Sequence, residues 1–457
     1  MDWDEIAERK HLVQCYGWAR LFVSRRSDIP GWVSSFRSGN LSSEIVEEFS
    51  GSFNRSCHIR FCDGVEWLAR FTMPGKVMDG DEKLRREVAA MRLVREKTSI
   101  PVPKVHSWGL SKENRLGLGP FIIMDFVRGG KSLHHLWRQS PDEAVLSSNV
   151  SEADLRTIYS QIAGFYLELS KLEFPHVGSL CIRDDQSIHT DLGPLTLKMQ
   201  EIEAHGGVKV GGNRSTTFPS ARDYFEYVAE QDLEQLYKQP NSVDNANDAR
   251  AKYKFRHQFN TLIPRFVNEE YHGMSPRLLC DDFRYGNLIV NNAKDLKILA
   301  VIDWEWAYAA PYQMFCSAPR WLLITKPTEW PTPNGEEFER YKACLDLFLD
   351  ELQQQEGDSD NLAIGSDRQR PRKLSAQMRR SLTDGTFWFH ELMYDCFTNA
   401  ENTAWKAVCS LHPDFESIPI AEEELKGFAE RKTKELEAYN AQWGTIKAAI
   451  KRHEMAS

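Results

Sequence analysis

A short polar segment, CDDFRYGN at residues 280–287, lies between two apolar runs that are typical of strands. It holds two adjacent carboxylates, Asp281 and Asp282, which are followed by Arg284 and Asn287. An aspartate can orient a hydroxyl and take its proton, and an amide oxygen can bind a hard metal ion. These residue types make the segment a candidate catalytic loop.

The residues that follow predict a hairpin that brings another carboxylate to the same place. Residues 288–302 contain two apolar runs around a turn at 291–295, and Asp303 comes directly after them. Because a hairpin brings its open ends together, Asn287 and Asp303 are expected to be neighbours. An amide oxygen and a carboxylate that converge on one point suit a divalent cation with oxygen ligands, such as Mg²⁺.

The order of these groups matches the logic of kinase catalytic loops, in which an aspartate precedes an asparagine by five residues and another aspartate follows. Asp282 would then orient and deprotonate an acceptor hydroxyl, while Asn287 and Asp303 hold Mg²⁺ on the nucleotide phosphates. The spacing selects Asp282 over Asp281, which is expected to be structural or solvated. Arg284 stands where a cation can approach the transferring phosphoryl group.

At these residues the chain resembles the aminoglycoside phosphotransferase and choline kinase superfamily, whose members carry H-x-D-x-x-x-x-N and then I-D-W-E. The matching segments are DFRYGN at 282–287 and VIDWEWA at 301–307, and the resemblance spans roughly residues 45–325. The chain looks most like the fungal phosphotransferase-like branch. The resemblance implies an α+β, bilobal protein-kinase-like fold with ATP in the cleft. Cys280 replaces the family's histidine, which props the loop, and a small thiol can pack there as an apolar group.

The N-terminal part offers a cation and a carboxylate for positioning the phosphates. Residues 53–71 predict a β-hairpin with an Asp-Gly turn, and the alternation of its second strand places Arg70 opposite the apolar face. Residues 81–97 predict a helix on which Glu87 borders the apolar stripe. We therefore expect Arg70 to pair with Glu87. The family usually has lysine at the place of Arg70, and its fungal members often have arginine.

Two further segments complete the expected nucleotide site. Ser52 belongs to GSFN at 51–54, which is expected to cover the phosphates as a loop with one glycine. Met124 and Phe126 belong to MDFV at 124–127, the expected linker between the lobes, whose backbone can meet adenine.

The chain of 457 residues divides into three expected parts. These are an N-terminal helical extension at 1–45, a nucleotide-binding lobe at 46–127 and a helical C-terminal lobe at 128–457. The last part contains the catalytic loop 280–287 and the metal motif 302–307.

The sequence also predicts the main features of the C-terminal lobe. Further helices are expected at 335–352, 373–400 and 420–453, and a polar, mobile surface loop is expected at 353–375. The hairpin at 288–302 is the one β element expected in this lobe.

Composition narrows the class of partner. The net charge of −9 argues against a sequence-independent nucleic-acid binder, and the sequence contains no apolar run long enough to span a membrane. Nine scattered cysteines without a C-x-x-C pair indicate reduced thiols and no zinc site. With an acidic, polar start, these features favour a cytoplasmic protein.

The favoured function is an ATP- and Mg²⁺-dependent kinase that phosphorylates a hydroxyl of a small-molecule acceptor. One alternative is a non-catalytic nucleotide-binding pseudokinase or scaffold, which Cys280 and Arg70 favour. Another is a protein kinase, but the sequence has no D-F-G, no A-P-E and no activation segment after Asp303. The acceptor, its pathway and the oligomeric state stay open at this point.

Overall fold

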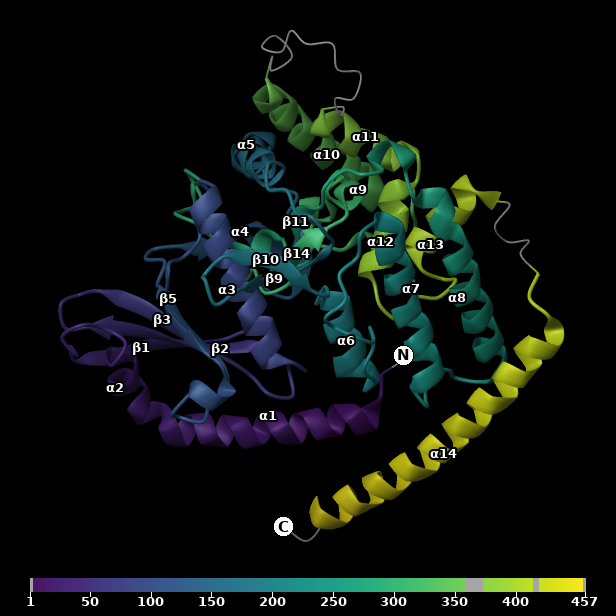
Figure 1. The fold of residues 1–457 in the computed structure, drawn as a ribbon, viewed down its shortest axis with the longest axis horizontal. Helices are drawn as coiled ribbons and strands as arrows, with labels where there is room; N and C mark the ends of the chain where they lie inside the picture. The colour runs from purple at the N-terminus through teal and green to yellow at the C-terminus, as the bar shows by residue number, and fades with distance from the viewer. Residues whose placement is uncertain (1–2, 358–372, 414–418, 455–457) are drawn as a thin grey trace.

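The computed structural model describes residues 3–357, 373–413 and 419–454, which form two lobes (Figure 1). The lobe at the N-terminal end is built on a sheet, and the other lobe is mainly helical, so the α+β, bilobal architecture expected from the sequence is confirmed. The polar loop expected at 353–375 lies mostly outside the described residues.

The N-terminal lobe holds a five-stranded antiparallel sheet in the order β1-β2-β3-β5-β4. Its strands are β1 (Ser43–Ser50), β2 (Asn54–Phe61), β3 (Glu66–Thr72), β4 (Val105–Gly109) and β5 (Phe121–Asp125). The predicted hairpin is β2–β3, and its Asp-Gly turn lies between the two strands. Strand β1 was not predicted, because it carries three glutamates, is largely exposed and shows no apolar alternation.

Three helices accompany this sheet: α1 (Glu5–Arg25), α2 (Ile29–Ser34) and α3 (Gly80–Lys97). Asp79 caps α3 by accepting a hydrogen bond from the backbone N–H of Glu82. The C-terminal half of α1 is part of the core of the N-terminal lobe, because Phe22 is fully buried and the Trp18 indole donates to the carbonyl of Leu118 at 3.0 Å. The N-terminal helical extension is therefore an integral part of the N-terminal lobe.

The other end of α1 contacts the C-terminal lobe at α6 (Leu197–Gly206). The backbone N–H of Asp4, the N-cap of α1, donates to the carbonyl of His205 at 2.6 Å, and a ring nitrogen of His11 lies 3.1 Å from the carbonyl of Ala204. Helix α1 thus runs from one lobe to the other along one side of the molecule (Figure 1).

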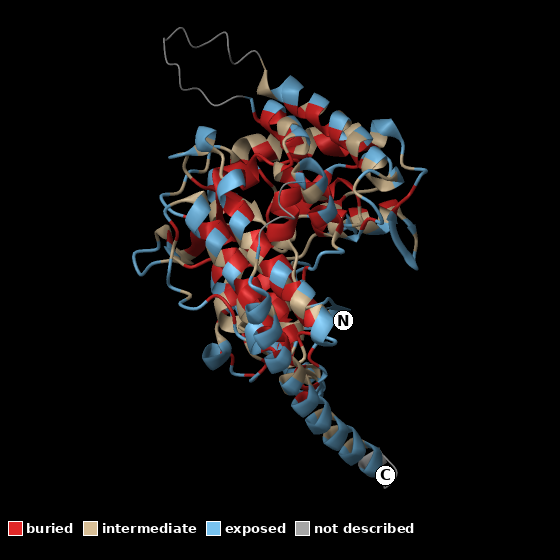
Figure 2. Ribbon diagram, turned by 90° about the vertical axis from the view of Figure 1, so that its right-hand side faces the viewer, coloured by how far each residue is buried: buried red, intermediate tan, exposed pale blue. Residues whose placement is uncertain are grey.

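Helices make up most of the C-terminal lobe. Besides α6 they are α4 (Leu133–Trp137), α5 (Glu152–Leu169), α7 (Ala221–Lys238), α8 (Ala246–Phe266), α9 (Tyr312–Phe315), α10 (Glu336–Glu356), α11 (Leu374–Thr383), α12 (Thr386–Tyr394), α13 (Thr403–Leu411) and α14 (Glu422–Glu454). The continuous helix predicted at 373–400 is wrong: it is broken between α11 and α12 at Gly385, whose φ of +81° does not fit a right-handed helix. The end of α14 projects from the body of the protein and is mostly exposed (Figure 2). None of the helices in the described part of the chain has the length and apolar character that crossing a membrane requires.

Short strands position the candidate catalytic loop. The predicted hairpin is β12 (Leu288–Val290) with β13 (Ile298–Val301), and β6 (Lys131–Ser132) pairs with its first strand. A second, unpredicted sheet has the order β10-β9-β14-β11, with strands β9 (Gly178–Ile182), β10 (Ile188–Leu192), β11 (Arg277–Cys280) and β14 (Ala307–Ala310). A further pair is β7 (Arg138–Ser140) with β8 (Glu143–Leu146). Because Cys280 pairs with Ala307 at the end of β11, the sheet holds the two motif segments side by side.

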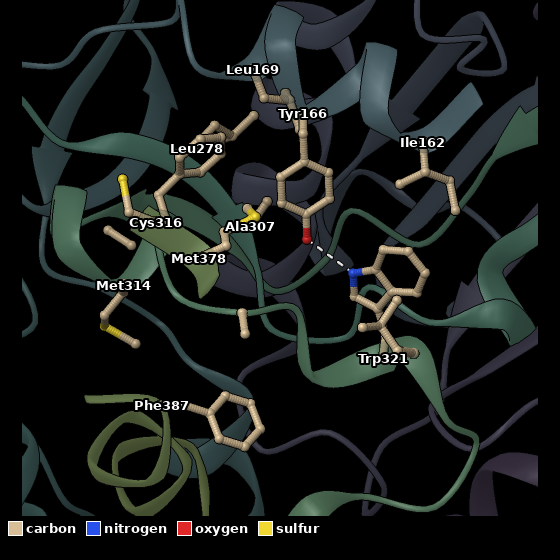
Figure 3. Packing of buried hydrophobic residues seen from close by; sticks show 14 of the residues in the cluster. Ile162, Tyr166, Leu169, Leu278, Ala307, Met314, Cys316, Trp321, Met378 and Phe387 are labelled. Atoms are coloured by element: carbon tan, nitrogen blue, oxygen red, sulfur yellow. Dashed lines mark hydrogen bonds between the residues drawn. The ribbon is translucent and has the colours of Figure 1, made fainter. Parts of the chain in front are cut away.

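A hydrophobic core lies beneath these strands, between α5 and the segment after β14 (Figure 3). The Trp321 indole donates to the hydroxyl of Tyr166 at 2.9 Å, and the hydroxyl of Tyr285 donates to the carbonyl of Leu322 at 3.0 Å. Since Tyr285 belongs to the candidate catalytic loop and is 2% exposed, the loop is anchored to this core.

Candidate active site

The carboxylate of Asp282 lines the cleft between the lobes and is held by two neighbours in its own loop. The Asn287 amide donates to the backbone carbonyl of Asp282 at 2.8 Å and to its Oδ2 at 3.1 Å. The Arg284 guanidinium donates to Oδ1 at 2.7 Å. Burial raises the pKa of Asp282, and Arg284 and Asn287 offset this only in part. The loop therefore presents an oriented carboxylate to the cleft.

The neighbouring carboxylate of Asp281 points to the other side of the loop, toward the helical lobe. Its Oδ2 accepts a hydrogen bond of 3.2 Å from the backbone N–H of Leu197, the first residue of α6, and its Oδ1 is buried. Burial raises the pKa of Asp281 to about 7. Of the two roles expected for Asp281, the structural one agrees with this position and the solvated one is wrong.

Cys280 contacts the metal motif through its thiol, which donates a hydrogen bond of 3.7 Å to the carbonyl oxygen of Asp303. Burial raises the pKa of this thiol, so it stays protonated and can donate. The residue that replaces the family's histidine thus contacts the backbone of the second motif as well as packing in the loop.

Arg70 joins both lobes at the cleft. Its guanidinium pairs with Glu87 of α3, which confirms the predicted ion pair, and its Nη1 donates to Oδ1 of Asp303 at 2.6 Å. The side chains of Arg70 and Glu87 are 6% and 1% exposed, so the pair is shielded from water. Burial raises the pKa of Asp303, and Arg70 counteracts this effect. The bridge from Arg70 to Asp303 was not predicted.

The backbones of Asn287 and Asp303 meet at the open end of the β12–β13 hairpin, as expected. The N–H of Ile302 donates to the carbonyl of Asn287 at 3.0 Å, and Asp303 follows in the left-handed region, with φ of +58°. This φ is uncommon for a residue other than glycine, and such residues cluster at functional sites.

The oxygen atoms at this place fit Mg²⁺. The amide oxygen of Asn287 accepts no hydrogen bond from the described residues, and the Asp303 side chain is 29% exposed, at the cleft. A carboxylate and an amide oxygen are the hard donors that this ion takes from proteins. Asp303 would have to share or release its contact with Arg70 when an ion binds.

A second buried network, which the sequence analysis missed, lies next to this pair. Lys83 of α3 pairs with Glu305, and Asn54 at the start of β2 contacts both, with its amide 3.0 Å from Glu305 and its oxygen 3.2 Å from the Lys83 ammonium. Lys83 is fully buried. Burial alone would raise the pKa of Glu305, but Lys83 and Arg70 lower it, so this carboxylate stays ionised. The available signal was the helical spacing, which puts Lys83 four residues before Glu87 on one face of α3.

The remaining predicted residues line the same cleft, which has a volume of about 580 Å³. Ser52 lies in the turn between β1 and β2, and Met124 and Phe126 lie at the linker between the lobes. The Phe126 N–H donates to the carbonyl of Glu66 at 3.3 Å, and its ring stacks on His58 at 3.6 Å between centroids. The backbone N–H of Phe126 is therefore already engaged in this conformation.

A strand-rich lobe and a helical lobe, with Asp282, Asp303 and Glu305 at the cleft between them, have the arrangement of a kinase-like fold. The sequence model described as the phosphotransferase enzyme family matches residues 46–313, more than half of the chain, and this protein belongs to that family. The family resemblance read from the two motifs is thereby confirmed.

Curated relatives of the chain are fungal, in agreement with the predicted branch. A protein of Debaryomyces hansenii named altered inheritance of mitochondria protein 9, mitochondrial, is 29% identical over 313 residues, which cover 60% of this chain and 48% of the relative. The protein of the same name from Candida dubliniensis is 29% identical over 145 residues, 31% of this chain and 22% of the relative. The chain thus spans about half or less of the length of these relatives.

Solved structures with a similar fold include two kinases of small molecules. An ethanolamine kinase of Plasmodium vivax is 12% identical, with 89% of this chain and 85% of that chain covered and a TM-score of 0.43. An aminoglycoside phosphotransferase of Streptomyces rimosus, solved with ADP and streptomycin, is 13% identical, with 81% and 99% covered and a TM-score of 0.38.

Proposed function

We propose that this protein is an ATP- and Mg²⁺-dependent kinase that phosphorylates a hydroxyl group of a small molecule. The observation that carries the proposal is that Asp282, Asp303 and Arg70, which come from three distant segments, line one cleft between the lobes. Phosphoryl transfer requires mainly positioning and charge neutralisation from the protein, and these groups can supply both.

Each residue has a distinct role in this proposal. Asp282 accepts the proton of the acceptor hydroxyl and orients its oxygen, and Arg284 holds that carboxylate in place. Asn287 and Asp303 would hold Mg²⁺, which when bound neutralises charge on the nucleotide phosphates. Arg70, fixed by Glu87, places a permanent positive charge at the phosphate end of the cleft.

The second candidate function is nucleotide binding without catalysis. The observation that favours it is the bridge from Arg70 to Asp303, which occupies one oxygen of the metal-binding carboxylate. In an active kinase this contact must give way when Mg-ATP enters, whereas in a scaffold it can persist.

The decisive experiment measures ADP release from Mg-ATP across a panel of amino alcohols, sugars and aminoglycosides. Turnover on at least one acceptor is expected, and Asp282→Asn should lower it by about 10²–10⁴-fold with ATP affinity nearly kept. Asp281→Asn is the matched control, because it changes the adjacent carboxylate that points away from the cleft, and it should cost much less. Nucleotide binding with no turnover on any acceptor, and no difference between the two variants, would establish the scaffold instead.

The partner and location follow as parts of the same proposal. A small-molecule acceptor is the expected partner. The proposed cytoplasmic location rests on the nine scattered cysteines, which include no C-x-x-C pair. The fungal relatives carry the word mitochondrial in their names, so fractionation of cells that express the full-length protein is the measurement that decides.

A further inference from the structure

A groove of about 780 Å³ lies beside α3, distinct from the cleft that holds the candidate active site. Its walls are α3, the segment 103–108 that includes β4, and residues 181–186 of the β9–β10 hairpin. The groove therefore lies where the two lobes meet around α3, the helix that carries Glu87.

The groove is cationic in a protein whose net charge is −9. The charged side chains that line it, apart from His106, are Arg85, Arg92, Arg95, Lys104 and Arg183 against Glu96 and Asp184. A concave surface of one sign concentrates its field and attracts ligands of the opposite charge. The occupant that this surface favours is therefore an anion.

Two of these cations have no carboxylate partner among the described residues. The Arg95 guanidinium donates to the backbone carbonyl of Val102 at 2.7 Å, and the Lys104 ammonium is exposed. Arg92 pairs with Glu96 at 2.8 Å, with the two side chains 34% and 51% exposed. An exposed pair of this kind contributes little, so its arginine can exchange partners when another carboxylate arrives.

Three of the other groups at the groove are paired in the same exposed manner: Arg85 pairs with Glu82, Arg183 pairs with Asp191 at 2.6 Å, and His106 lies 2.7 Å from Asp125. Asp184, on the β9–β10 hairpin, has no cationic partner among the described residues. An anionic ligand thus meets two cations without carboxylate partners and a rim of weakly held ones, with Asp184 as the one unpaired carboxylate of the lining.

The backbone at the groove favours an extended peptide. Strand β4 is an edge of the five-stranded sheet, so one side of its backbone has no neighbouring strand. Trp108 of β4 is 37% exposed, and Val105 and Ile182 add apolar surface between the charges. An edge strand with apolar and charged side chains beside it is a template for an added strand.

We propose that this groove binds an acidic, extended peptide segment of a partner protein, which pairs with the edge of β4 and places its carboxylates against the arginines and Lys104. The site is separate from the proposed kinase chemistry and needs no nucleotide. Because α3 presents Glu87 to Arg70 on its other side, a bound segment would lie against the helix that positions the phosphate-binding arginine.

The test is fluorescence anisotropy of the whole protein, without nucleotide, against a labelled peptide of four Glu-Val repeats. Saturable binding is expected, weakened by added salt, and a Lys-Val peptide of equal length should not bind. The double variant Arg92→Glu, Lys104→Glu should weaken binding at least about tenfold. The control Lys254→Glu, Lys434→Glu makes the same change of net charge at exposed positions of α8 and α14 and should bind like the parent. Thermal melts verify that both variants are folded.

Four outcomes would overturn the proposal. Absence of binding, or equal weakening by both double variants, would show that the groove is not the site. Displacement of the Glu-Val probe by inorganic triphosphate or single-stranded DNA at lower concentration than by unlabelled Glu-Val peptide would assign the groove to another class of anion. Undiminished binding of a probe with alternate backbone amides N-methylated would exclude pairing with β4. Since every readout is binding, failure here leaves the kinase proposal standing, and the reverse also holds.

Discussion

Two of the buried charge clusters among the described residues, one at the cleft and one inside the helical lobe, differ in their balance of charge. At the cleft, two cations, Arg70 and Lys83, face three carboxylates, Glu87, Asp303 and Glu305. One carboxylate, that of Asp303, is 29% exposed, whereas the other four side chains are 6% exposed or less.

In the helical lobe, one carboxylate lies between two cations. Asp232 of α7 pairs with Lys198 of α6 at 2.8 Å and with Arg256 of α8 at 2.8 Å. All three side chains are 2% exposed or less, and they join three helices.

The comparison shows how a functional cluster of buried charges can be distinguished from a structural one. The helical cluster is closed to solvent, so its charges are satisfied by one another and by polar groups of the same lobe, such as the carbonyl of Leu392 at 3.4 Å from the Lys198 ammonium. The cleft cluster has one carboxylate more than it has cations, and that surplus group is the one that reaches the cleft. A bound cation would complete its charge, and such an open, incomplete cluster marks a candidate site better than burial alone does.

The largest effect on nucleotide binding is expected from removing the surplus carboxylate. Asp303→Ala should lower Mg²⁺-dependent affinity for ATP by about 100-fold or more, because the ion loses its charged ligand. Isothermal titration with and without Mg²⁺ measures this. Asp142→Ala, an exposed aspartate, is the control. If Asp303→Ala binds Mg-ATP as the parent does, the cleft cluster is no more functional than the helical one.

Removing the carboxylate of the helical cluster should lower the stability of the fold and leave nucleotide binding nearly unchanged. Asp232→Ala leaves Lys198 and Arg256 buried without their carboxylate, and it should lower the free energy of unfolding by about 3–5 kcal/mol. Denaturant titration measures the loss. ATP affinity of the remaining folded protein should stay within about threefold of the parent. An unchanged unfolding midpoint would contradict this assignment.

A smaller effect on nucleotide use is expected from Glu87→Gln. Arg70 keeps its contact with Asp303 but loses the carboxylate that fixes its position on the α3 side, so KM for ATP should rise about tenfold. Steady-state kinetics and a thermal melt separate this from a loss of stability. Glu82→Gln on the same helix should leave KM unchanged, and equal effects of the two variants would dismiss the positioning role.

The smallest effect is expected at the carboxylate that faces away from the cleft. Burial raises the pKa of Asp281 to about 7, whereas in the unfolded chain this carboxyl loses its proton at about pH 4. Between these two pH values the folded protein therefore keeps a proton that the unfolded chain has released. The stabilising contribution of that proton is complete below about pH 4 and is lost as the pH rises to about 7. Asp281→Asn removes this dependence, so its Tm relative to the parent should rise by a few degrees, about 2–4 °C, between pH 5 and pH 8. An equal Tm difference at both pH values would show that Asp281 is ionised in the folded state.

The sequence could predict the parts of this site that depend on local order. The hairpin between Asn287 and Asp303 follows from two apolar runs and a turn, and alternation along β3 was enough to place Arg70 opposite the apolar face. The ion pair of Arg70 with Glu87 joins β3 and α3, which are near each other in the sequence, and the apolar pattern of each element indicates which way its charged side chain points.

Contacts that depend on how the two lobes pack together could not be predicted from the sequence. Arg70 and Asp303 are 233 residues apart, and nothing in either local pattern indicates that they meet. Lys83 looked like one more charge on a polar helix, because its partner Glu305 belongs to the other lobe. Strand β14 has four residues, too few for a pattern to distinguish it from loop, and the strand-like run that became β11 carried no signal of the strand it pairs with.

Helix α1 has a mechanical consequence for the cleft. Its 21 residues make a rod about 31 Å long, with its N-cap hydrogen-bonded to α6 and with Trp18 and Phe22 of its C-terminal half buried in the core of the N-terminal lobe. A rod attached at both ends fixes the distance between its two points of attachment but leaves rotation about its own axis free. Opening and closing of the cleft should therefore be a rotation of one lobe relative to the other about an axis along α1, rather than a separation of the two lobes. The side of the molecule along α1 should move least.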